Sequence, residues 1–436
     1  MSSYGNVTTR IIDPVFDRAN LRVEFRLPAD SCYLSSMRLI NFGIDSNNAA
    51  TSYNPQLGAL GAIRNISVFD GSVLLEQLTD ASLLNAFKNV QAENDYNLSV
   101  NRSLKYNENG YTTSGVPGFV NNTELSRNAY QVATQNPGGN NIGKKAWISL
   151  RDCISFLRSS SVVPTNVYRQ FRVVVEYNDA SALKYLTSVS NAVVTTSADA
   201  LFLVDEVNDG DAKDSMMRNY DGVAFRPIEA ERVVVPASAP ANDTEGEQAL
   251  SFLVNGFNNK RLNRLLVVQQ SGDATTYDVA NVNVGNGVIA SVPQWRTEFN
   301  LRINGKNKLA GNGIAGSPAT ATSDPGSSAN RRLAYLTDTW GNTNIAPSQN
   351  AVSLNDEANY VSTALQARKQ DYIGCLVSDV IQELQIQYSR NPVGAASTSA
   401  GSNASQRQQL FLSVFGEVER AVVMGAGGSY NVIYAV

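Results

Sequence analysis

The sequence predicts an all-β protein made of two tandem eight-stranded jelly rolls with short flanking helices. Apolar runs rich in β-branched and aromatic residues recur along the chain between clusters of Gly, Pro, Asn and Asp, which is typical of strands. Helical periodicity is scarce. In addition, four sequence blocks occur twice in the same order, about 205 to 235 residues apart. A β domain of about 200 residues with about eight strands has the size of a jelly roll.

The clearest repeat is a pair of strands. QFRVVVEYND at 170–179 has a looser copy, QELQIQYSRN, at 382–391. Each is followed about thirty residues later by an apolar block, ALFLVDEV at 200–207 or QLFLSVFGEV at 409–418. The repeat predicts that the two halves of the chain share one strand plan.

Two further repeats precede that pair in each half. Residues 19–44 are echoed by 247–270, as an apolar strand, a polar break and a basic-then-aliphatic strand. Residues 62–77 are echoed by 294–311, where an alternating strand runs into an Asp-Gly or Asn-Gly turn. The sequence therefore predicts an N-terminal roll, a polar linker and a C-terminal roll, over 1–208, 209–222 and 223–436.

The individual elements follow from local patterns. Strands are expected where apolar alternation is bounded by turn residues: 21–28, 35–44, 63–71, 171–177, 201–207, 231–237, 249–257, 264–270, 298–305, 381–388 and 410–418. Helical spacing predicts short helices over 82–90, over 150–157 after a Ser149 N-cap, and over 353–369.

Long polar segments separate these elements. Residues 107–145 and 310–333 are rich in Asn, Gly, Ser and Thr, and we expect them to form surface loops that contact other molecules. Residues 1–13 form a polar arm whose composition gives it no anchor of its own, so we expect the arm to become ordered against a neighbouring chain.

Composition excludes several function classes. The formal net charge is −4, with 35 basic and 39 acidic residues, so we expect no direct nucleic-acid binding. Histidine is absent, which removes every His-based triad and every HExxH zinc site and lowers the expectation of an enzyme. We expect no catalytic residues, no cofactor and no bound metal. The N-terminal sequence lacks a signal-peptide core, and no apolar run is long enough to span a membrane.

Three cysteines, Cys32, Cys153 and Cys375, are spaced too widely for a CxxC zinc site. We expect them to be buried reduced thiols that pack as small apolar side chains. This cysteine usage favours folding in a reducing compartment.

Several motifs resemble ligand sites but lack essential parts. GGNNIGKK at 138–145 has Lys145 where a phosphate-binding loop needs a hydroxyl, and GNGIAG at 311–316 is followed by a segment that cannot begin a helix. The acidic segment from Asp205 has Val207 and Met216 where a calcium loop needs oxygen ligands. Calcium bound at an interface through Asp209, Asp211 or Asp214 stays an open alternative.

The order of these patterns resembles a known family. LGAIRNISVFDGSVLLEQL at 60–78, then SLRDCISFL, VVPTNVYRQFRVVVEYND and LFLVDEV, are similar to the double jelly-roll major capsid proteins of virophages and polinton-like viruses. More distant likeness extends to large eukaryotic DNA viruses, tectiviruses and adenovirus hexon. The tail from Gln409 resembles the last two strands of the second roll, and the likeness covers nearly the whole chain.

This resemblance implies a structural protein. It would form homotrimeric, pseudo-hexameric capsomers of an icosahedral double-stranded DNA virus shell, made in the host cytoplasm or a virus factory and located in the virion capsid. Its partners would be other copies of itself, through trimer and capsomer–capsomer contacts, together with penton and minor capsid proteins. It would be the major capsid protein of that shell, and a minor double-roll capsid protein stays an open alternative. The alternative from the residues is a lectin-like or fibre β-sandwich that binds sugars through its loops, although Trp147, Trp295 and Trp340 favour packing in or beside strands.

Overall fold

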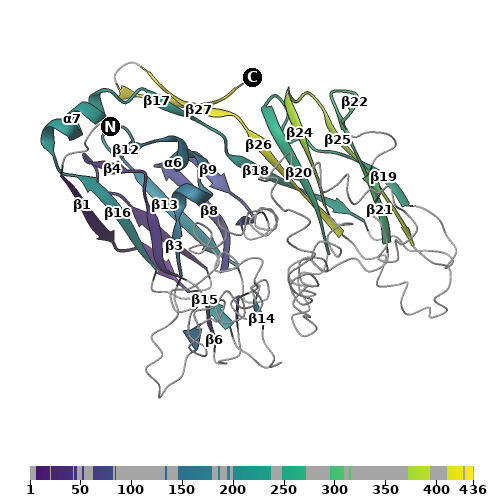
Figure 1. Cartoon of the computed structure of the whole chain (residues 1–436), viewed down its shortest axis with the longest axis horizontal. Helices are drawn as coiled ribbons and strands as arrows, with labels where there is room; N and C mark the ends of the chain where they lie inside the picture. The colour runs from purple at the N-terminus through teal and green to yellow at the C-terminus, as the bar shows by residue number, and fades with distance from the viewer. Residues whose placement is uncertain are drawn as a thin grey trace, which may run out of the picture. The chain divides into compact units, whose positions relative to one another are not determined.

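The computed structural model describes most of the predicted strands (Figure 1). The described residues are 6–19, 21–42, 44–46, 52–53, 62–81, 84, 133–134, 146–178, 185–186, 194–196, 200–236, 248–271, 295–308, 314–315, 372–392, 410–425 and 428–435. They form two compact units. One holds the described residues up to Glu229 together with Glu419–Ala435, and the other holds those from Ala230 to Val418.

The first unit contains two packed antiparallel sheets. In the first sheet, β1 (Val7–Ile12) pairs with β16 (Leu201–Val207), followed by β5 (Arg38–Phe42) and β11 (Ala146–Ser149), while β4 (Cys32–Leu34) and β12 (Val162–Pro164) extend from the other end of β16. The second sheet runs β2 (Phe16–Arg18), β3 (Arg22–Arg26), β13 (Phe171–Tyr177), β8 (Ile63–Asp70) and β9 (Val73–Leu78). The buried rings of Phe25 and Phe202, 5.2 Å apart, join the two sheets in the core.

The second unit repeats this plan. Its first sheet runs β18 (Ile228–Val235), β26 (Leu410–Val418), β20 (Arg261–Ser271) and β24 (Tyr372–Val380). Its second sheet runs β19 (Gln248–Leu253), β25 (Leu384–Pro392), β21 (Trp295–Ile303) and β22 (Lys306–Asn307), with β23 (Ile314–Ala315) also on β21. Inward side chains such as Leu301, Ile386 and Leu412 form its core.

The two strand orders correspond one to one. The order β1-β16-β5-β11 in the first unit matches β18-β26-β20-β24 in the second, and β3-β13-β8-β9 matches β19-β25-β21-β22. Matching strands also follow one another in the same order along the chain. The described strands thus form two eight-stranded jelly rolls, which confirms the predicted fold class, and all four predicted sequence repeats fall on equivalent strands.

The predicted hairpin turns also lie at equivalent places. Asp70 ends β8, and Gly71 and Ser72 connect it to β9, while Asn304 and Gly305 connect β21 to β22. Gly71, Asn304 and Gly305 have φ values of +56°, +50° and +78°, in the left-handed region that glycine and asparagine tolerate best. The Asn304 side chain reinforces its turn, because it donates to Val380 O at 2.8 Å and accepts from the Gln382 amide at 2.8 Å.

The helices differ from the prediction. The helix expected over 150–157 is two single turns, α5 (Leu150–Cys153) and α6 (Ser155–Ser159), because Ile154 between them is extended, with φ −111°. Ser149 makes no side-chain cap. The expected linker 209–222 instead contains α7 (Gly210–Arg218), whose N-cap Asp209 accepts a hydrogen bond from the Ala212 amide at 2.9 Å. The helices expected over 82–90 and 353–369 lie almost wholly outside the described residues.

Short strands complete the first unit. β6 (Ile44–Ser46) pairs with β10 (Ala133–Thr134) and β15 (Val194–Thr196), and β7 (Ser52–Tyr53) pairs with β14 (Tyr185–Leu186). Apart from β10 and β23, the expected loops 107–145 and 310–333 lie outside the described residues. Among the described residues no helix is both long and apolar enough to cross a bilayer.

The tail differs from the resemblance in one respect. Only β26 belongs to the second roll, whereas β27 (Arg420–Met424) and β28 (Tyr430–Tyr434) form a small sheet with β17 (Gly222–Phe225) in the first unit. The expectation that the tail supplies the last two strands of the second roll is therefore wrong for its final part, because β26 alone completes that roll. The boundaries 1–208, 209–222 and 223–436 stay a prediction.

A buried carboxylate fixes α6 to the edge of the second sheet of the first unit. Glu76 on β9 is almost wholly buried, and its oxygens accept hydrogen bonds from the amides of Ser155 and Phe156 at 2.9 and 2.6 Å and from the Ser155 hydroxyl. Burial raises the pKa of Glu76 above its usual value, against the opposing effect of these hydrogen bonds.

We predict that Glu76→Gln changes the pH dependence of stability. Because the pKa of Glu76 is raised on folding, its contribution to stability is fully present below the unfolded pKa of about 4.5 and is lost as pH rises towards the folded pKa. Gln does not titrate. In urea unfolding between pH 4.5 and 8, the free energy of unfolding of the variant should therefore increase relative to that of the parent protein as pH rises. Ser155→Ala keeps the carboxyl but removes a hydrogen bond that lowers the pKa of Glu76, so its stability should fall with rising pH at least as steeply as the parent's. A constant difference between Glu76→Gln and the parent would contradict the prediction.

Candidate functional site: the N-terminal edge of the first roll

Two of the acidic residues in the segment from Asp205 make structural hydrogen bonds within the first unit. Asp209 caps α7, and Asp205 accepts hydrogen bonds from the hydroxyls of Thr9 and Ser36, both at 2.7 Å. Asp214 lies 3.9 Å from Arg218 on the exposed side of α7. Within the described ranges, no three acidic or cysteine side chains stand close enough to hold a metal ion. The absence of a bound metal stays a prediction for the whole chain.

The glycine motifs do not form ligand sites where they are described. Residues 138–145 lie outside the described ranges. Within 311–316, Ile314 and Ala315 form β23, which pairs with β21. A dinucleotide site would need a helix to begin there, so this glycine motif lacks the required geometry.

The carboxylates of Glu229 and Glu231 on β18 each accept a hydrogen bond. Glu229 accepts from the Tyr434 hydroxyl at 2.7 Å, and Glu231 accepts from the Gly256 amide at 2.6 Å. These bonds give each carboxylate a structural partner.

The cysteines are free thiols. Cys32 and Cys375 are buried, and burial raises their pKa values to about 11 and about 12, which keeps the thiols protonated and unreactive at neutral pH. The prediction of buried packing thiols is confirmed for these two, while Cys153 is only half-buried. Trp147 and Trp295 lie in β11 and β21 as expected, and Trp340 lies outside the described residues.

The described feature best suited to a function is the chain's N-terminal edge, residues Val7–Leu21. β1 pairs antiparallel with β16 along its full length, from Val7 opposite Val207 to Ile12 opposite Phe202. The pairing continues to Asn6, whose carbonyl accepts from the Asn208 amide at 2.8 Å. The expectation that residues 1–13 have no anchor in their own chain is therefore wrong for Val7–Ile12.

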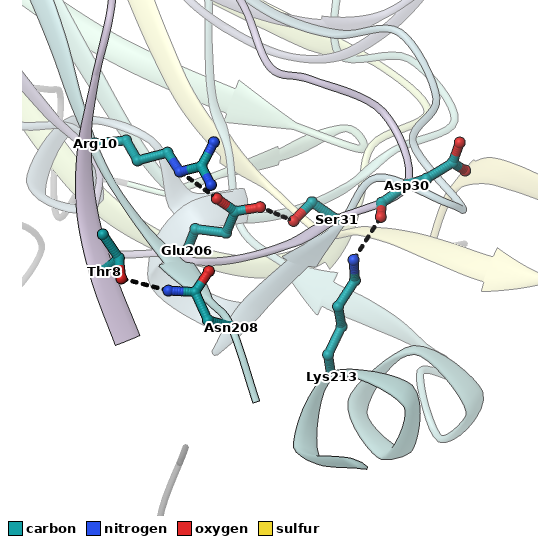
Figure 2. A network of polar contacts seen from close by, with 7 residues as sticks. All are labelled: Thr8, Arg10, Asp30, Ser31, Glu206, Asn208 and Lys213. Atoms are coloured by element: carbon teal, nitrogen blue, oxygen red, sulfur yellow. Dashed lines mark hydrogen bonds and ion pairs between the residues drawn. The ribbon is translucent and has the colours of Figure 1, made fainter. Parts of the chain in front are cut away.

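A buried carboxylate holds β1 from the inner side of the sheet (Figure 2). Glu206 is 9 % exposed; its Oε2 lies 2.5 Å from Arg10 Nε, and its Oε1 accepts a hydrogen bond from the Ser31 hydroxyl. The Asn208 side-chain amide donates to the Thr8 hydroxyl at the end of the strand pair. These contacts join residues 175 to 200 positions apart, which is why the polar composition of the arm alone did not reveal them.

A second set of contacts lies on the opposite face. The Asp205 carboxylate joins Thr9 of β1 to Ser36, and Arg38 approaches it at 4.0 Å. The Lys213 ammonium on α7 donates to the carbonyl of Asp30, the residue before Ser31, at 2.7 Å (Figure 2). β1 is thus fixed on both faces of its sheet, and the residues that follow it leave from a rigid position.

The N-terminal edge also exposes apolar side chains. Of the ten large apolar side chains that stand exposed in the described ranges, four belong to this stretch: Ile11, Val15, Phe16 and Leu21. Within the described sheets, β1 and β2 each pair on one side only, with β16 and β3. Edge strands with exposed apolar side chains are suited to contacts with another protein surface. The arrangement offers binding rather than chemistry.

Comparisons with solved structures agree with the fold. VP54 of PBCV-1, fitted into a reconstruction of the virophage Sputnik, matches 100 % of this chain and 98 % of its own, with 10 % identity and a TM-score of 0.56. The mavirus major capsid protein matches 98 % and 90 %, with 11 % identity and a TM-score of 0.51. A chain of the Sputnik virophage matches 99 % and 89 %, with 9 % identity and a TM-score of 0.50.

The matches confirm, at the level of the fold, the resemblance to double jelly-roll major capsid proteins. No family model matches the sequence, and no curated protein does so either.

We predict that Arg10→Met destabilises the first roll by about 1 kcal/mol. The substitution leaves the buried Glu206 carboxylate without its cation, and the half-exposed position of Arg10 keeps the loss at the lower end of the range for such groups. The measurement is urea unfolding of the variant beside Arg18→Met, an exposed control on β2.

Adding Glu206→Gln to Arg10→Met should restore part of the loss, because the buried charge is then removed. Equal stabilities of Arg10→Met and Arg18→Met would show that the ion pair does not hold β1.

Proposed function

We propose that this protein is the major capsid protein of an icosahedral double-stranded DNA virus of the virophage or polinton-like type, forming pseudo-hexameric homotrimers. The observation that carries the proposal is the pair of jelly rolls with identical strand order in one chain. The solved capsid proteins that it resembles share this fold over nearly their whole length.

The geometry of a duplicated roll explains the proposed mechanism. Three chains with two rolls each present six similar lobes, so a threefold trimer fills a sixfold position in a shell. The two rolls need not make identical contacts, since their sequences have diverged. Closing a ring of three requires that one surface of each chain bind a different surface of the next. An obligate interface of this kind is expected to bury more than about 2,000 Å².

The N-terminal edge is our candidate for one of these two surfaces. It presents Ile11 and Phe16 from edge strands β1 and β2, which pair with β16 and β3, and Val15 from the segment between them. A preordered apolar surface loses little conformational entropy on binding, which favours a stable contact.

The remaining properties follow from this role. The protein would act through its surfaces and would be neither an enzyme nor a direct nucleic-acid binder, in keeping with its lack of histidine and its net charge of −4. It would reside in the virion and contact penton and minor capsid proteins as well as copies of itself. A lectin-like or fibre role is less well supported, because nothing in such a role calls for two rolls of the same plan.

We predict that the purified protein forms trimers, and shells or flat hexagonal arrays when concentrated. Mass photometry gives the number of chains per particle, and electron microscopy of negatively stained samples shows whether the particles have six lobes. A protein that stays monomeric at every concentration and binds a glycan array would overturn the capsid proposal and favour the lectin-like role.

The double variant Val15→Ser/Phe16→Ser should raise the concentration needed for trimers at least about tenfold, because about 1.4 kcal/mol of lost apolar contact has that effect. The matched control is Val73→Ser, an exposed apolar side chain on the β8–β9 hairpin of the same roll. If the double variant forms trimers at the same concentration as the control and the parent, the N-terminal edge is not the interface, while the proposed function stands.

A further inference from the structure

The first unit carries strands beyond the eight of its jelly roll. Residues Glu419–Ala435, here the C-terminal ribbon, form β27 and β28, which are closed into a hairpin by the Gly425 amide donating to Ser429 O at 2.7 Å. β27 pairs with β17 from Gly222 opposite Val423 to Phe225 opposite Arg420. The second roll is complete at Val418, so the ribbon adds nothing to that roll's strand plan.

Polar side chains of the ribbon meet specific partners on the first roll. The Tyr430 hydroxyl donates to Asp70 Oδ2 at 2.7 Å, and Asp70 Oδ1 accepts from the Gln170 amide at 2.7 Å, so the carboxylate is held in position. The Arg420 guanidinium donates to the Leu74 carbonyl at 3.3 Å. Both partners lie on the β8–β9 hairpin, which therefore contacts β27 through Arg420 and β28 through Tyr430.

Aromatic side chains form the floor beneath the ribbon. The Tyr430 ring packs edge-on against Tyr168, with centroids 5.2 Å apart. Tyr168 is wholly buried, and its hydroxyl shares a 2.7 Å hydrogen bond with that of Tyr220. Arg420 lies over the rings of Phe225 and Tyr434, 5.8 and 4.8 Å from their centroids. This is a shaped surface with charged, aromatic and backbone partners.

Gly222 shows that β17 is adapted to receive the ribbon. Its φ is +103°, and a Cβ at this position would lie 2.1 Å from the carbonyl oxygen of Val422 on β27. No other residue type fits so close an approach of two backbones. The strained glycine is explained by the ribbon and by nothing within the jelly roll itself.

We propose that the first roll carries a binding site for a two-stranded β-ribbon, made by β17, Asp70, Leu74, Tyr168 and Phe225. The chain's own residues 419–435 occupy it, and the site retains affinity for that ribbon when it is supplied as a separate peptide. Strand addition to β17 provides backbone hydrogen bonds, and the Tyr430 and Arg420 contacts provide selectivity. The inference is independent of the proposed capsid function.

The test uses the full-length chain with Arg420→Ala/Tyr430→Ala, which weakens its own ribbon and leaves the site intact. A fluorescent peptide of residues 419–435 is titrated in, and its anisotropy is followed. The variant should bind the peptide at least about tenfold more tightly than the parent chain, whose tethered ribbon competes at an effective concentration on the order of millimolar. Adding Gly222→Ala should abolish binding, and a peptide with Tyr430→Phe should bind about tenfold more weakly.

Hydrogen exchange of the same full-length variant shows whether its own ribbon has left the site. Amides of β27 and β28 should lose protection, while those of β20, β21 and β25 keep theirs. The proposal is overturned if the ribbon keeps its protection in the variant, or if the peptide does not bind the emptied site. It is also overturned if Gly222→Ala leaves the affinity for the peptide unchanged. If the double variant does not fold, Tyr430→Phe alone should raise exchange in β28 about tenfold, and no change there would also overturn it.

Discussion

Antiparallel pairing between strands that are distant in sequence is the constraint on which this molecule depends. In the first roll β16 pairs with β1, about two hundred residues earlier, and with β4 and β5 on its other side; in the second, β26 pairs with β18 and β20. Neither roll can close its first sheet until its last strand is in place. Ordering so many residues before these contacts form costs entropy, and folds of this kind are therefore slow to form.

Local patterns were sufficient to predict the strands and their duplication. The inner face of a strand alternates with the outer face, and β13 shows this as buried Phe171, Val173 and Val175. Turn preferences are equally local, because few residue types other than Asn and Gly tolerate the positive φ values found at Asn304 and Gly305. Because these signals repeat in the same order in each half, the sequence also indicated which strands are equivalent. The fold class was therefore predictable without knowledge of any long-range contact.

The candidate site was not predictable in the same way. The Arg10–Glu206 pair and the Tyr430–Asp70 bond join residues about 196 and 360 positions apart, and no local pattern marks either residue as a partner. α7 was missed because its acidic, glycine-containing sequence resembles a linker, while its order depends on Met216, Met217 and Tyr220 packing on the cluster of Cys32, Val162 and Val207. The helix is interrupted at Ile154, where the amides of Ser155 and Phe156 donate to the buried Glu76 carboxylate. This partner is distant in sequence, so local spacing could not indicate the interruption.

The position of the C-terminal ribbon has a consequence for synthesis. Residues 419–435 leave the ribosome after both rolls, long after their partners Asp70, Leu74 and Tyr168 have emerged. A nascent chain can therefore complete both eight-stranded rolls while the aromatic floor on the first remains uncovered, a state in which exposed apolar rings favour aggregation or chaperone binding. Only synthesis of residues 419–435 conceals this floor, so a chain that terminates before them differs chemically, on the surface of its first roll, from a chain that contains them.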